Sequence, residues 1–180
     1  MFTLHTPKVR YESVFSTTPQ SVPAVRHQAR TILTQWMPGI TEGSLDRALL
    51  IVGELVANAV KHAARLSPRA ELSLETADHQ LIISVHDRDP HHPQALSAAS
   101  PDGTGGRGMR IVYDLASEVG GIVEVHSDAD LGGKLVRVCV PLRTNSRQPT
   151  TTAPREHAPR GTEQSRRPNE PTGAGPAVRH

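Results

Sequence analysis

Residues 51–62 constrain the fold more than any other stretch of the chain, because they have the pattern of a long amphipathic helix. Apolar side chains recur at helical spacing through and around this stretch, which predicts one buried helix face. They are Leu45, Leu49, Val52, Val56, Ala59 and Ala63. Glu54, Asn58 and His62 recur four residues apart on another side, where side chains of one helix are neighbours. A solvated helix face has the same pattern, so the meaning of these three residues depends on the rest of the chain.

The flanking segments predict strands and helices in a definite order. We expect strands at residues 9–16, 71–76, 81–85, 122–126 and 135–141 from their β-branched and alternating apolar residues. We expect helices from Ser21, as N-cap, to Pro38, from near Ser44 to about Arg65, and over residues 107–119. This order predicts an α+β fold, a two-layer sandwich with helices on one face of a mixed, mainly antiparallel sheet.

Composition divides the 180 residues into three parts. Residues 1–8 are an N-terminal extension, residues 9–142 hold almost all large apolar side chains, and residues 143–180 are rich in Pro, Thr and Arg. The last part cannot bury a core and is predicted to be disordered. It contains seven Arg and three Glu, so residues 1–142 carry a net charge of −2 although the whole chain has +2. A scattered Arg tail without aromatic residues gives little support for direct nucleic-acid binding.

The sequence also bears on compartment. Cys139 is the single cysteine, no apolar run is long enough to cross a bilayer, and the first ten residues lack the apolar centre of a signal peptide. We therefore expect a cytoplasmic protein without membrane contact. The 17 Arg against 3 Lys suggest a bacterium with a GC-rich genome.

Glu54 and Asn58 suit phosphoryl chemistry. Magnesium prefers oxygen ligands and usually shares them with phosphates and water, so the Asn58 amide oxygen can serve as one protein ligand. A carboxylate one helical turn earlier can accept a proton from the group that attacks the phosphate.

Two further segments extend this pattern. Asp87 ends an apolar strand, where its carboxylate can accept a hydrogen bond from an exocyclic amine such as adenine N6, or can belong only to a turn with Asp89 and Pro90. The stretch 103–109 reads Gly-Thr-Gly-Gly-Arg-Gly-Met directly before a helix. Its glycines and free helix amides suit a phosphate and Arg107 can add a charged contact, although a flexible connector has similar composition. No Gly-Lys-Ser/Thr follows, which excludes a Walker loop.

Together the three segments resemble the GHKL ATP-binding fold of gyrase B, histidine kinases and the mismatch-repair protein MutL. Glu54 and Asn58 match its first box, Asp87 its second, and Gly106-Arg107-Gly108 its third, over residues 9–142. The resemblance implies a Bergerat-type sandwich that binds ATP and Mg²⁺. It assigns Asn58 to magnesium, Glu54 to the catalytic base and Asp87 to adenine, with Arg107 near the phosphates. The full nucleotide-binding set that it implies is Asn58, His62, Asp87, Gly105, Gly106, Arg107, Gly108 and Met109.

Two positions depart from the family pattern. Asp89, followed by Pro90, stands where the second box has glycine, and this additional carboxylate would reshape or weaken the base pocket. Gly133-Lys134-Leu135 supplies no hydroxyl where the family often has a threonine that supports the adenine-binding aspartate.

Among small single-domain members, the chain is most similar to anti-sigma factor serine kinases of the RsbW and SpoIIAB type. This implies a serine/threonine kinase with Glu54 and Arg107 as catalytic residues. Its partners would be a sigma factor and a STAS-type anti-anti-sigma protein, and a homodimer is possible. The alternative is a module that binds nucleotide and regulates a partner by contact alone. An orphan histidine kinase lacks support, because no phospho-acceptor helix pattern is present.

Two other kinds of site were considered. His86, Asp87, Asp89, His91 and His92 form a cluster of zinc-ligand types, but a Pro-rich loop makes a poor rigid cage. The loop fits a lid better. No Gly-x-Ser-x-Gly motif supports a hydrolytic triad.

Overall fold

The computed structural model describes residues 8–91, 106–128 and 132–145. Its eight elements follow the predicted order. They are β1 (Val9–Ser16), α1 (Ser21–Trp36), α2 (Glu42–Ala63), β2 (Arg69–Ala77), β3 (Gln80–Asp87), α3 (Arg107–Ser117), β4 (Ile122–Ser127) and β5 (Lys134–Pro141). The loop predicted at residues 89–104, which was interpreted as a lid, lies outside the described residues from His92 onward.

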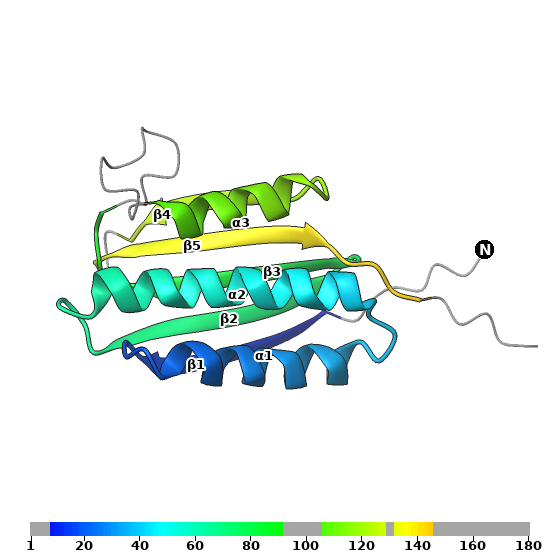
Figure 1. Cartoon of the computed structure of the whole chain (residues 1–180), viewed down its shortest axis with the longest axis horizontal. Helices are drawn as coiled ribbons and strands as arrows, with labels where there is room; N and C mark the ends of the chain where they lie inside the picture. Colours follow the sequence, from blue (N-terminus) through cyan, green and yellow to red (C-terminus); the bar gives the residue numbers. More distant parts are fainter. Residues whose placement is uncertain (1–7, 92–105, 129–131, 146–180) are drawn as a thin grey trace, which may run out of the picture. The chain divides into compact units, whose positions relative to one another are not determined.

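The five strands form one sheet in the order β1-β2-β3-β5-β4, and all four pairings are antiparallel. The three helices lie side by side on one face of this sheet, with α2 between α1 and α3 (Figure 1). The α+β two-layer fold class is therefore confirmed, and the described sheet is wholly antiparallel where a mixed, mainly antiparallel one was predicted. The alternation along the strands explains the fold class, because every second side chain points toward the helices and most of these side chains are apolar.

The core lies between α2 and the sheet. All six apolar positions that predicted a buried face of this helix are buried, and the strands of the sheet, β3 above all, supply the opposing layer. The members from these strands include Leu81, Ile83, Val85, Val136 and Val138. Each such side chain contributes about 1.5–3 kcal/mol when removed from water. Burial of this stripe fixes which side of α2 remains for the polar residues.

The ends of the helices differ slightly from the sequence predictions. Helix α2 begins at Glu42 rather than near Ser44, because Thr41 is the N-cap and its side chain accepts a hydrogen bond from the Ser44 backbone N–H at 3.3 Å. The helix ends at Ala63, two residues earlier than expected. Ser21 is not the N-cap of α1 but its first residue, and Gln20 before it makes no side-chain capping bond.

The hairpin between β2 and β3 was predicted, and its turn is tight. Asp78 and His79 both have positive φ, at 49° and 62°, between the paired residues Ala77 and Gln80. Two-residue turns with positive φ at both positions match the natural twist of antiparallel strands. This turn sets the register that carries β3 to Asp87.

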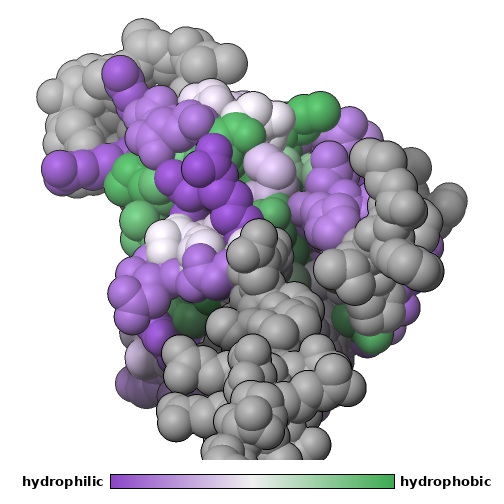
Figure 2. Space-filling model, turned by 90° about the vertical axis from the view of Figure 1, so that its right-hand side faces the viewer, coloured by the Kyte–Doolittle hydropathy of each residue, from purple (hydrophilic) through white to green (hydrophobic). Residues whose placement is uncertain are grey.

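The chain beyond β5 contacts the connection between α1 and α2. The Asn145 N–H donates to the Gly39 carbonyl at 2.7 Å, and Ile40 and Thr144 form a bridge. Contacts thus continue three residues past the predicted domain end at residue 142. Figure 2 views this side, where hydrophilic side chains surround smaller hydrophobic areas. Residues 146–180 and the first seven lie outside the described residues. No described helix is long and apolar enough to span a membrane.

Candidate functional site

Helix α2 carries the first group of predicted site residues on three successive turns. Glu54 and Asn58 are half-buried and His62 is exposed, whereas the flanking Leu55, Val56 and Ala59 are buried. Neither Glu54 nor Asn58 makes a side-chain hydrogen bond to another described residue. Both side chains lie on the side of α2 away from the buried apolar stripe.

The start of α3 lies against Glu54. Gly106 is the N-cap with φ of 85°, the left-handed conformation that glycine adopts without strain. A Cβ atom placed on Gly108 would lie 2.6 Å from Glu54 Oε2, closer than real contacts allow. The carboxylate of the first box thus reaches the backbone of the third. A larger residue at position 108 would displace the Glu54 carboxylate.

A buried ion cluster stands at the end of β3. Lys134 Nζ donates to Asp87 Oδ1 at 2.9 Å and to the Asp89 backbone carbonyl and Oδ2, both at 3.1 Å. Lys134 is 1% exposed, Asp87 2% and Asp89 5%. The three N–H donors of the ammonium therefore have three protein acceptors. Two carboxylates and one lysine share this cluster, so its formal net charge is −1.

Glycine makes this cluster possible. Asp87 of β3 pairs with Lys134 of β5. Lys134 directly follows Gly133, whose φ is 104°. A Cβ on Gly133 would overlap the Asp87 carbonyl oxygen. The glycine allows the two backbones to approach, so that the long Lys134 side chain extends beneath Asp87. Asp89 then folds back, and its N–H donates to Asp87 Oδ1 at 2.9 Å.

Two nearby groups have shifted pKa values. Burial alone would raise the pKa of Asp89, but hydrogen bonds from His91 and Lys134, with the lysine charge, hold this pKa below its ordinary value. Burial, followed by repulsion from Lys61, lowers the pKa of His62, while Asp89 and Asp87 oppose this shift and Lys134 adds to it. Helix α2 packs against β3, which brings the charges of the ion cluster near His62.

The other predicted residues fall in different surroundings. Arg107 is exposed at the first position of α3, where its guanidinium faces solvent. Met109 is 2% exposed and belongs to the hydrophobic core. Gly105 lies outside the described residues. The structure therefore places the Glu54 carboxylate next to Gly108. It places His62 close enough to Asp87 for the Asp87 charge to act on the pKa of His62. The Met109 side chain packs between α3 and the rest of the core.

Sequence reasoning missed the role of Lys134. It treated residues 133–135 as lacking a hydroxyl and Asp89 as a carboxylate that would disturb the base pocket. The structure shows that Lys134 and Asp89 form ion pairs within the same cluster. A lysine directly after two glycines in an otherwise apolar strand, opposite the strand-ending Asp87, was the available signal.

The zinc interpretation gains no support from the described residues. They contain no group of three or more His, Cys, Asp or Glu side chains that could hold a metal, and His92 lies outside them. His86 and Asp87 are consecutive in β3 and so point to opposite faces of the sheet. His86 Nε2 instead lies 3.1 Å from Asp128 Oδ2.

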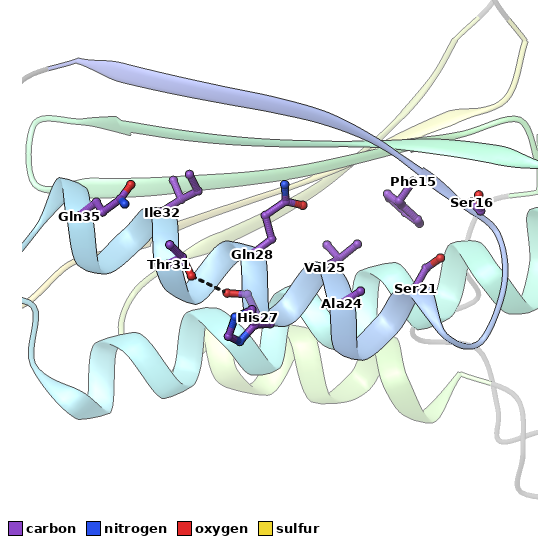
Figure 3. A pocket seen from close by; sticks show the side chains of 10 residues that line it. All are labelled: Phe15, Ser16, Ser21, Ala24, Val25, His27, Gln28, Thr31, Ile32 and Gln35. Atoms are coloured by element: carbon purple, nitrogen blue, oxygen red, sulfur yellow. Dashed lines mark hydrogen bonds between the residues drawn. The ribbon is translucent and has the colours of Figure 1, made fainter.

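Two open grooves occur elsewhere among the described residues. One, with a volume of about 660 Å³, runs between β1 and α1 and is bordered by Phe15, Val25 and Ile32 (Figure 3). The other, of about 360 Å³, lies on the uncovered face of the sheet around Ser73, Ser84 and His86. Neither includes a predicted site residue, so they give no support to the three-box site and no evidence against it.

The described residues fit a nucleotide phosphate well. They fit an adenine base with one difference from the family pattern, which is that the protein already occupies one oxygen of Asp87. The amides and glycines at the start of α3, with the oxygen atoms of Glu54 and Asn58, suit phosphates and a hard cation. At the base end, both hydrogen bonds that Asp87 accepts from described residues arrive at Oδ1. One oxygen of that carboxylate is therefore already engaged by the protein.

Comparisons with known proteins agree with this architecture. Residues 15–140 match the family model described as a histidine kinase-like ATPase domain. Among solved structures, the chain is similar to the histidine kinase domain of the Erythrobacter litoralis EL346 blue-light activated histidine kinase, with 21% identity and a TM-score of 0.45. That match covers 67% of this chain and 61% of the other, so this chain spans less than two thirds of that relative.

A mycobacterial sensor histidine kinase, MprB, is also similar, with 17% identity, a TM-score of 0.46, and coverage of 74% of this chain and all of the other. A search of curated proteins finds no significant match. Because the family model spans more than half of the sequence, the protein belongs to the histidine kinase-like ATPase domain family, a class of ATP-binding, kinase-like domains.

Proposed function

We propose that this domain is an anti-sigma factor with protein serine/threonine kinase activity. It would bind a sigma factor and phosphorylate a serine of a STAS-type anti-anti-sigma partner. One observation supports the catalytic part most strongly. The Glu54 carboxylate lies against Gly108 at the start of α3 and one helical turn before Asn58. A candidate base, a candidate magnesium ligand and a candidate phosphate-binding helix start are thus neighbours.

The reaction assigns a separate task to each of these residues. Magnesium ATP supplies the γ-phosphoryl group. Glu54 accepts the proton of the partner serine as its oxygen bonds to the γ-phosphorus and the bond to the bridging oxygen of ADP breaks. The Asn58 amide oxygen binds the cation. Arg107, exposed at the head of α3, neutralises charge on the transferred group.

The remaining site residues hold the nucleotide. The amides and glycines from Gly106 to Gly108 approach the phosphates, and Asp87 accepts a hydrogen bond from the exocyclic amine of adenine. The lowered pKa of His62 favours a neutral imidazole at pH 7. We therefore expect His62 to contact the nucleotide through a hydrogen bond from its ring N–H and not as a cation.

A non-catalytic nucleotide-binding module is the second candidate. The observation that favours it is the engagement of Asp87 Oδ1 by Lys134 and by the Asp89 N–H. If this engagement weakens nucleotide binding, the domain could regulate its partner by contact without transferring phosphate.

The test is a transfer assay with γ-labelled ATP, magnesium and a serine-bearing STAS regulator from the same genome. Wild-type protein should label the regulator, and Glu54→Gln should reduce the rate by about 10²–10⁴-fold, the usual contribution of a general base. Glu71→Gln, an exposed change on the opposite face of the sheet, is the matched control and should transfer at the wild-type rate. Nucleotide binding without transfer would support the module, and unchanged transfer by Glu54→Gln would contradict the assignment of the base.

A further inference from the structure

The cluster of Asp87, Asp89 and Lys134 is built in a way that the proposed kinase reaction does not explain. Lys134 is among the most buried side chains of the described core, and such a cation is rarely retained unless it is fully paired. It is fully paired here, with acceptors at 2.9, 3.1 and 3.1 Å. No donor remains on Lys134 for a ligand, so the residue does not contact a nucleotide itself.

The effect of Lys134 falls on Asp87. An ionised carboxylate has two oxygens, each with room for about two hydrogen bonds. Oδ1 accepts from Lys134 Nζ and from the Asp89 N–H, both at 2.9 Å. These two bonds fill one oxygen and fix the plane of the group, and they leave Oδ2 as the acceptor for an incoming donor.

Asp89 completes the arrangement. Its Oδ2 and carbonyl oxygen hold the ammonium, while its Oδ1 accepts from His91 N–H at 3.1 Å and lies 2.8 Å from His91 Nδ1. Without the Asp89 carboxylate, the lysine would lose one of its three acceptors and one of its two ion-pair partners. Without Lys134, two buried carboxylates would repel each other across a short distance. The two residues therefore depend on each other.

We propose that Lys134 and Asp89 act as a positioning pair that fixes Asp87 Oδ1 and presents Oδ2 to the 6-amino group of adenine. The pair takes the place of the glycine and the hydroxyl that the resemblance calls for at these positions. This inference rests on the proposed function in one respect, because it takes Asp87 as the base-recognising residue.

The test compares the binding of ATP with that of purine riboside triphosphate, which lacks only the 6-amino group, in the full-length protein by calorimetry with magnesium. Wild type should bind ATP about 10–100-fold more tightly, the range for a hydrogen bond to a charged group. The double variant Asp89→Asn with Lys134→Met removes one charge of each sign. It should lower this ratio toward one by weakening ATP alone, because Asp87 is no longer held in one orientation.

The control is Arg30→Met with Asp46→Asn, which removes an exposed ion pair of 3.4 Å between α1 and α2 and should keep the wild-type ratio. A thermal unfolding scan of each variant confirms that it is folded at the assay temperature. If the double variant is unfolded there, Asp89→Asn alone is used and should lower the ratio in the same direction.

Each outcome has a defined meaning. A wild-type ratio near one would overturn the inference, because Lys134 would then occupy the carboxylate instead of presenting it, while the kinase proposal would stand. A ratio unchanged in a folded variant would overturn it as well and leave a purely structural role. Absence of any ATP binding by wild type would overturn the proposed function and this inference together.

Discussion

Lys134 Nζ lies 2.9 Å from Asp87 Oδ1, and both side chains are almost completely buried at the point where β3 and β5 pair. Asp89 closes the cluster from the other side. Removing one partner of a buried ion pair leaves an uncompensated charge, which costs more than the pair contributes when intact. The stability of this region should therefore depend strongly on each member.

Lys134→Met tests this dependence. The change leaves Asp87 and Asp89 buried without a cation, and we expect a loss of about 3–5 kcal/mol in the free energy of unfolding, measured with urea. Arg137→Met is the control, because Arg137 is exposed on the same strand and should change stability by no more than about 0.5 kcal/mol. Equal effects of the two changes would contradict the buried ion cluster.

Acid should weaken the same cluster. The pKa of Asp89 is lower in the folded protein than its ordinary value, so the unfolded chain binds the proton more readily. The contribution of Asp89 to stability is then complete above pH ~4 and is lost as the pH falls through the folded pKa. The difference in unfolding free energy between wild type and Asp89→Asn should shrink from pH 5 to pH 2.5. A difference that stays constant over this range would show that Asp89 has no lowered pKa.

Much of the fold was predictable from the sequence, because it depends on local periodicity. The apolar stripe of α2 and the alternation in β2 and β3 gave the elements, their order and the layer arrangement. Positions of helix ends were less accurate, since the capping bond from Thr41 competes with the apparent start at Ser44.

In the candidate site, too, the local relationships were predictable and the long-range contacts were not. Glu54 and Asn58 share a helix, so their proximity followed from spacing alone. The contact of Glu54 with Gly108 and the ion cluster join residues that are 54 and 47 positions apart in the chain, and only the packing of α3 and the register of β5 bring them together. Met109 belongs to the nucleotide-binding set that the resemblance implies, and the structure shows that its side chain packs in the core.

Gly108→Ala tests the contact between the first and third boxes. The added methyl group would lie 2.6 Å from Glu54 Oε2, so the carboxylate must move. We expect phosphotransfer to fall at least tenfold in kcat with a smaller change in KM, because a displaced base impairs the chemical step more than binding. Gly43→Ala in α2 is the matched control, since a Cβ there meets nothing within 4 Å. A kcat loss of the same size in Gly43→Ala would show that the loss in Gly108→Ala does not come from the contact with Glu54.

The pKa of His62 can be measured directly by NMR titration of its ring protons. We expect a value below 6.5, because burial and the neighbouring Lys61 charge disfavour the imidazolium form. Lys61→Gln should raise this pKa part of the way back, since burial is the larger cause and remains. A wild-type value at or above 6.5 would show that burial and the Lys61 charge do not outweigh the opposing charges of Asp89 and Asp87.

The central claim is that α2, the end of β3 and the start of α3 form a single nucleotide site. A titration of the ¹⁵N-labelled protein with magnesium ATP, followed by amide NMR, tests it most directly. The account predicts that the backbone amides of Gly106, Gly108 and Asp87 and the Asn58 side-chain amide shift together with one dissociation constant, while Gln28 in the groove between β1 and α1 does not. Shifts confined to that groove, or none at these four positions at millimolar ATP, would contradict it.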